Sequence, residues 1–276
     1  MVERARKGFY ETITEAVRYF AAHGFTSSER LEYWITEIRQ AAERSMVPTY
    51  VLERQLQTTF GTVYRRMVDQ GGLLKKHKGI DRFTIQQVAP RLRAELDRRL
   101  MASAQLIKLN RVEAMEKTVR RFAGWASSVP EGGSDNVGKA DVKDDVRKAL
   151  AQLPFVERRV AIDQGHKFAS SLNEIVAAGG GAIAVKWNSH FRQANYDYRE
   201  DHKERDGQVY LLRNNWAQQR GLVKPGPAGY YDAVTAFGEE VYCRCFGTYL
   251  YNLRDLPDDM VTAKGREELE RVRIVR

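Results

Sequence analysis

The chain has 276 residues, and 43% of them are hydrophobic, which is enough for real cores and excludes a fully disordered chain. Two cysteines exclude a disulfide-stapled secreted scaffold, and no uncharged apolar run is long enough for a membrane-spanning helix. We therefore expect a reducing, cytosol-like compartment and no membrane partner. The net charge of +9 lies within residues 1–125, because residues 126–276 contain 22 basic and 22 acidic residues.

Helical periodicity dominates the first half of the chain. Apolar residues recur three and four apart over residues 9–20, and His23-Gly24 ends that pattern. The Thr-Ser-Ser-Glu segment that begins at Thr26 is a capping box, which predicts the start of a second helix. Pro48 suits the first turn of a third helix, and Gly71-Gly72 stop it.

The densest cationic stretch, residues 73–79, is predicted to be a loop. A helical pattern rich in arginine follows over residues 84–125, and its length suits a spacer or an assembly arm. Both segments are candidates for contact with nucleic acid or an acidic protein, and the alternative is a solvated basic surface without a partner. The residues expected to make such contacts are Lys75, Lys76, Lys78, Arg82, Arg98 and Arg99.

Residues 127–140 are rich in Ser, Gly, Pro and Asp, which predicts a linker between two domains. Residues 1–126 are then a helical, basic assembly or docking domain, and residues 141–276 are the second domain. The second half carries two helical patterns and a charged C-terminal one, with predicted strands at residues 182–187, 208–212 and 240–250. The predicted class is α+β: a mainly helical N-terminal domain with a long helix, then a smaller α+β domain with a short antiparallel sheet.

The candidate metal ligands lie in the second half. Cys243 and Cys245 alternate in a predicted strand, so both thiols point to the same side. Together with His202 and Asp206, they are a donor set that suits zinc. The alternative is that the cysteines are small buried side chains in the core, because structural zinc sites usually have C-x2-C spacing. No sequence motif supports His202 as a general base, so no catalytic residue is predicted.

Nine residues form an ordered pattern on either side of a Pro/Gly-rich loop: Trp187, Arg199, His202, Asp206 and Gly207, then Glu239, Cys243, Arg244 and Cys245. This pattern resembles the minor head protein domain of tailed phages of the phage Mu protein F type, over residues 154–256. A predicted helix with Arg159 and Asp163 precedes it, where that family has a helix with Arg and Glu. The chain departs from the family at Arg205, where leucine is usual, and at Phe246, where a basic residue is common.

The resemblance implies a minor capsid or head morphogenesis protein without an established catalytic activity. Such a protein belongs to a multi-protein particle, assembles in the host cytoplasm and resides in the virion, at the head interior or the portal vertex. The implied partners are the portal, the major capsid protein and packaged DNA. The residues alone leave two alternatives: a metal-dependent hydrolase or nuclease that uses the four candidate ligands, and a DNA-binding module in the basic half.

Overall fold

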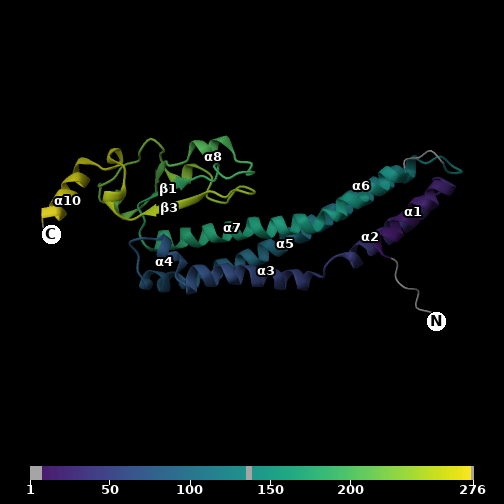
Figure 1. Ribbon diagram of the computed structural model, residues 1–276, viewed down its shortest axis with the longest axis horizontal. Helices are drawn as coiled ribbons and strands as arrows, with labels where there is room; N and C mark the ends of the chain where they lie inside the picture. The colour runs from purple at the N-terminus through teal and green to yellow at the C-terminus, as the bar shows by residue number, and fades with distance from the viewer. Residues whose placement is uncertain (1–7, 135–138, 275–276) are drawn as a thin grey trace. The chain divides into compact units, whose positions relative to one another are not determined.

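The computed structural model describes residues 8–134 and 139–274 (Figure 1). Helices dominate this part of the chain, and three short strands form an antiparallel sheet, so the predicted α+β class is confirmed. The α-helices are α1 (Phe9–His23), α2 (Ser28–Ser45), α3 (Thr49–Tyr64), α4 (Gly72–Lys76), α5 (Arg82–Ser128), α6 (Lys139–Ala151), α7 (Leu153–Gly179), α8 (Glu200–Glu204), α9 (Trp216–Gln219) and α10 (Ala263–Ile274). The strands are β1 (Ala184–Asn188), β2 (Val209–Leu211) and β3 (Phe246–Leu250).

Two local details differ from the predicted helix boundaries. The N-cap of α2 is Ser27, whose hydroxyl accepts a hydrogen bond from the Arg30 backbone N–H, and not Thr26. The cationic stretch is not entirely a loop, because α4 occupies its first part. Gly71 has a φ of 73°, a left-handed conformation that lets the chain turn and begin a new helix directly after the π-helical turn Arg65–Asp69.

The chain forms two compact units, each built from two separate stretches. The first comprises Met1–Gln55 and Ala102–Val160, and the second comprises Leu56–Met101 and Ala161–Arg276. The sequence predicts two domains, each one continuous stretch, on either side of residues 127–140, whereas each unit of the structure combines two separate stretches. The difference arises because α3, α5 and α7 each begin in one unit and end in the other along the chain.

The first unit has a core of helical side chains that includes Ile13, Phe20, Ile38 and Phe122, all of them fully or almost fully buried. The start of the predicted linker is packed into this unit. Backbone N–H groups of residues 132 and 134 donate to carbonyls of residues 23 and 21, and Val129 is only 2% exposed. Residues 135–138 of that linker lie outside the described residues.

In the second unit, β1 is the central strand, and the order is β2-β1-β3. Val185 pairs with Tyr210 on one side and with Tyr249 on the other. The third strand is shorter than the predicted 240–250, because Tyr242 adopts a φ of 62° and residues 240–243 form a turn. Both cysteines therefore lie just before β3 and not within it.

The face of the sheet that carries Trp187 packs against Phe237, Cys243 and Cys245 in one apolar cluster. The opposite face packs against a second cluster formed by the chain around Leu222 and Met260. The candidate ligands thus belong to the hydrophobic interior on one side of the sheet. None of the described helices is long and apolar enough to cross a membrane.

Most of the basic excess belongs to the second unit. Residues 56–101 contain ten basic and four acidic residues, and residues 161–276 contain 16 of each. The positive charge that the sequence places in a separate N-terminal domain is therefore concentrated in helices that fold together with the sheet.

Substitution of Gly247 tests the packing of β3. An added β carbon would lie 2.6 Å from both Phe237 Cε2 and Val185 Cγ2. We predict that Gly247→Ala lowers the free energy of unfolding by about 1–3 kcal/mol, the usual cost of overpacking. Gly61→Ala, in the interior of α3 with nothing within 4 Å, is the matched control and should raise it by about 0.5–1 kcal/mol. Denaturant-induced unfolding gives both values, and equal effects of the same sign would contradict this packing.

Candidate functional site

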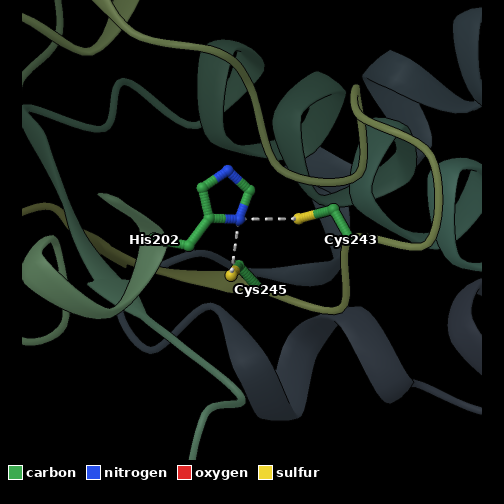
Figure 2. A group of neighbouring side chains, drawn as sticks. All are labelled: His202, Cys243 and Cys245. Carbon is green, nitrogen blue, oxygen red and sulfur yellow. Dashed lines mark hydrogen bonds between the residues drawn. The ribbon is translucent and has the colours of Figure 1, made fainter. Parts of the chain in front are cut away.

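His202, Cys243 and Cys245 meet in the interior of the second unit (Figure 2). His202 Nδ1 lies 3.7 Å from Cys243 Sγ and 3.5 Å from Cys245 Sγ. One donor atom from each residue falls within 4.8 Å of the others. The exposed fractions of the three residues are 2%, 1% and 4%, so solvent has almost no access to them. The structure therefore brings together three of the four predicted ligands.

The two segments that carry these side chains are shaped by short local structures. His202 lies on the single-turn helix α8, and the chain then turns at Gly207, whose φ is 81°. The Gly207 N–H donates to the Trp187 carbonyl at 2.9 Å, which closes the turn from α8 onto β1. Glycine suits this turn because it adopts a positive φ without steric cost. On the other side, the turn of residues 240–243 presents both cysteines to the imidazole.

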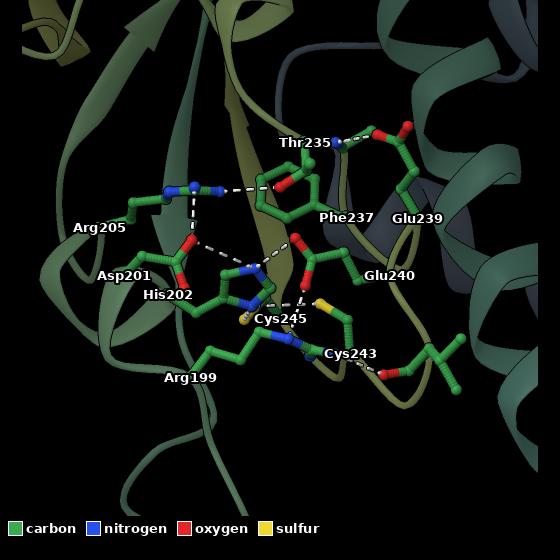
Figure 3. Close-up of polar contacts among 12 residues, drawn as sticks. Arg199, Asp201, His202, Arg205, Thr235, Phe237, Glu239, Glu240, Cys243 and Cys245 are labelled. Carbon is green, nitrogen blue, oxygen red and sulfur yellow. Dashed lines mark hydrogen bonds and ion pairs between the residues drawn. The ribbon is translucent and has the colours of Figure 1, made fainter.

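The far side of the imidazole faces two carboxylates (Figure 3). His202 Nε2 is 3.6 Å from Glu240 Oε1 and 3.9 Å from Asp201 Oδ2, and it is buried without a hydrogen-bond partner among the described residues. Each carboxylate also pairs with an arginine, Glu240 with Arg199 at 2.6 Å and Asp201 with Arg205 at 2.7 Å. These ion pairs hold the acidic groups beside the ring.

Trp187 completes the surroundings of the histidine. Its ring centroid is 5.5 Å from that of His202 and 4.4 Å from that of Phe237, and its side chain is fully buried. The Arg205 guanidinium lies over the same indole, 5.1 Å from its centroid. The aromatic rings exclude water from one side of the site, which strengthens the electrostatic interactions within it.

The two thiols have opposite acidities. A hydrogen bond with Cys245 lowers the pKa of Cys243 to about 6. The same hydrogen bond, together with burial, raises the pKa of the Cys245 thiol. Two cysteine sulfurs and an imidazole nitrogen are soft and borderline donors that suit zinc, which binds cysteine as thiolate.

Two acidic residues of the sequence pattern lie apart from the donor group. The Asp206 carboxylate accepts from the Ser189 backbone N–H at 2.8 Å and pairs with Arg192 at 3.2 Å. Glu239 accepts from the Ala236 N–H at 2.7 Å. Among the described residues, Asp206 is in neither group of converging metal-binding side chains. Its role is to hold the start of the loop after β1, which corrects the prediction of a ligand.

Sequence reasoning missed the carboxylates that do face His202. Asp201 is its neighbour in α8, and Glu240 immediately follows Glu239. The single turn of α8 and the turn at residues 240–243 do not follow a regular helix or strand period. The signal in the sequence is that Asp201 and Glu240 are each adjacent to a residue of the pattern, His202 and Glu239 respectively.

Asp163 of α7 is a further residue of the site. The sequence places it in a helix before the pattern residues but assigns it no role in the site. Its Oδ1 accepts from the Tyr242 backbone N–H at 2.6 Å, and its Oδ2 pairs with Lys167 at 3.3 Å. Tyr242 is the residue in the left-handed conformation. Asp163 therefore stabilises the backbone that positions Cys243.

Arg244 faces away from the two thiols. The Tyr196 hydroxyl donates to the Tyr242 carbonyl at 3.1 Å and accepts from the Arg244 backbone N–H at 3.2 Å. The Arg244 guanidinium lies 5.4 Å from the centroid of the Tyr196 ring. Tyr196 and Arg199, which donates to the Val241 carbonyl at 3.1 Å, thus fix the cysteine loop from the segment before α8.

The predicted partner-contact residues divide into two groups. The first group is exposed, and within the described chain its members form no ion pair that would neutralise their charge: Lys75, Lys76, Lys78 and Arg82. Arg98 and Arg99 instead both bond to the Glu95 carboxylate. The Arg99 side chain is partly buried, with 18% of its surface exposed, and it also donates a hydrogen bond to the Ser171 hydroxyl. Arg99 therefore serves the packing of α5 against α7, which corrects its assignment to a partner surface.

The cationic stretch is tied to the sheet by His77. This residue is 1% exposed, with Nδ1 2.6 Å from the Tyr251 hydroxyl and Nε2 3.0 Å from Asn173 Oδ1. Burial lowers the pKa of His77, and the hydrogen bond to Asn173 opposes that shift. The neighbouring lysines thus project from a fixed backbone.

No family model, curated protein or solved structure matches this chain. The resemblance to the phage Mu protein F type therefore remains a prediction that depends on the pattern residues themselves.

We predict that Asp163→Ala destabilises the second unit by about 2 kcal/mol, because it leaves the partly buried Tyr242 backbone N–H and the Lys167 ammonium without their acceptor. Glu239→Ala is the control: it removes a similar bond to a backbone N–H from an exposed residue, and should cost less than about 1 kcal/mol. Chemical denaturation of the two variants measures the difference. Equal losses would show that Asp163 does not stabilise the loop.

Acid should weaken the packing around His77. Its pKa is lower in the folded than in the unfolded chain, so stability is complete above about pH 6.5 and falls as the pH drops through the folded value. We predict that His77→Gln is less stable at pH 7.5, yet loses less stability than the natural chain between pH 7.5 and 5.5, because glutamine does not titrate. Unfolding curves at both pH values measure this, and parallel losses would contradict the assignment.

Proposed function

We propose that the chain is a structural protein of a tailed-phage head, a minor capsid protein of the phage Mu protein F type. The observation that carries the proposal is the convergence of the pattern residues. Trp187, His202 and the two cysteines come from three separate segments and share one buried cluster. Arg199 joins them through Glu240. A chance similarity of spacing would not require these side chains to meet.

The burial of the cluster favours a structural role over hydrolysis. A hydrolytic site needs a position where substrate and water reach the reactive group. Here the most exposed of the three donors is 4% accessible, and Trp187 is fully buried. Asp206, which the hydrolase alternative also needs, is engaged by a backbone N–H and an arginine. The arrangement suits a centre that holds segments together.

The exposed cations supply the docking surface in this proposal. Residues 56–101 have a net charge of +6. Four exposed basic residues project from this segment: Lys75, Lys76, Lys78 and Arg82. An acidic face of the portal or of the major capsid protein is the partner we infer for them, and packaged DNA offers the same negative charge. The hydrogen bonds of His77 anchor the backbone from which the lysines project.

Purified heads of the phage that encodes the chain test the proposal. We expect mass spectrometry to detect the chain in heads, in far fewer copies than the major capsid protein. Its absence from both immature and mature particles would refute the assignment.

Charge reversal tests the docking surface. Lys75→Glu, Lys78→Glu and Arg82→Glu together should reduce the number of copies per head at least about tenfold, because opposed charges then repel. The control reverses three exposed basic residues of the first unit, Arg18, Arg44 and Lys143, and should leave the copy number close to normal. Equal incorporation of both triple variants would place the docking surface elsewhere.

A further inference from the structure

The spacing of the donor atoms matches a tetrahedral metal site. With Zn–S bonds of about 2.3 Å and Zn–N bonds of about 2.0–2.1 Å, a sulfur and a nitrogen ligand stand about 3.5 Å apart. The two sulfur atoms lie 3.7 Å and 3.5 Å from His202 Nδ1. An ion can therefore be placed between the three atoms with little movement of the backbone.

The orientation of His202 provides a second, independent observation. Its Nδ1 faces both sulfurs, and its Nε2 faces the carboxylates of Glu240 and Asp201. Histidine ligands usually give their second ring N–H to a carboxylate, which fixes the tautomer and makes the coordinating nitrogen a better donor. Nε2 is buried and lacks a hydrogen-bond partner in the described structure. A slight closure towards Glu240 would satisfy it.

We propose that the second unit binds one Zn²⁺ through Cys243 Sγ, Cys245 Sγ and His202 Nδ1, with Glu240 orienting the imidazole. The fourth position lies on the side of Ser189, whose hydroxyl is 3.9 Å from Cys245 Sγ, and it is filled by water or by that hydroxyl. The ion joins α8 to the loop before β3, two segments held mainly by side-chain contacts. This proposal stands independently of the assignment to a phage head.

The metal content of the full chain tests the site directly. After expression in zinc-supplemented medium and gel filtration, we expect about one zinc per chain by mass spectrometry of the elements. Replacement by Co²⁺ should give the near-ultraviolet absorption of thiolate-to-cobalt charge transfer, together with the visible bands of a tetrahedral ion. Less than about a tenth of a zinc per chain, or a cobalt spectrum without thiolate absorption, would overturn the proposal.

Four variants identify the ligands. Cys243→Ser and His202→Gln should each lose stoichiometric zinc. Asp206→Asn should retain it, because Asp206 lies outside the donor group and Asn still accepts from the Ser189 N–H. Glu240→Gln should retain the site with about 10–100-fold weaker affinity, measured by competition with a chelating dye.

Zinc retained by Cys243→Ser, or lost by Asp206→Asn with its circular dichroism unchanged, would overturn the ligand assignment. If the ligand variants fail to fold, the natural chain still decides. In mild denaturant, which opens the buried site, zinc should protect Cys243 and Cys245 from a thiol reagent and chelation should make them reactive, whereas equal reactivity in both states would contradict zinc binding.

Discussion

The contact between the His202 imidazole and the two cysteine sulfurs is the interaction on which the site depends. It joins residues 41 and 43 positions apart, and it does so in a region with little regular secondary structure. Arg199, Tyr196 and Asp163 each bond to the backbone of residues 241–244, so two separate segments, the one before α8 and helix α7, hold the cysteine loop against the ring. Buried polar groups are costly unless they are satisfied, and this network satisfies most of them.

The chemistry of the site was predictable from residue types, whereas its detailed partners were not. The alternation of Cys243 and Cys245 with His202 nearby predicts a metal site as one of two readings, the other being two cysteines buried in the core. The carboxylate predicted as a ligand, Asp206, holds the loop after β1, and the carboxylates that face the imidazole are those of Asp201 and Glu240. This difference arises in turns, where the direction of a side chain depends on individual dihedral angles such as the positive φ of Tyr242.

The elements of the fold followed from periodicity, and the grouping of these elements did not. The long helical pattern before residue 125 is α5, as predicted, and it is continuous from Arg82 to Ser128. A Ser/Gly/Pro-rich stretch predicted a domain boundary, yet its first residues pack against the turn after α1. Sequence cannot show that a helix contributes its two ends to different cores. For the same reason, the basic stretch of residues 56–101 belongs with the sheet.

In the proposed role, the buried cluster holds segments of the chain together and the exposed cations dock to partners. The central proposal is that the His202 and cysteine side chains form one metal-binding centre. X-ray absorption at the zinc edge of the full-length protein tests it most directly. We predict a first shell with two sulfurs at about 2.3 Å and nitrogen at about 2.0–2.1 Å. A shell of oxygen and nitrogen alone would contradict it.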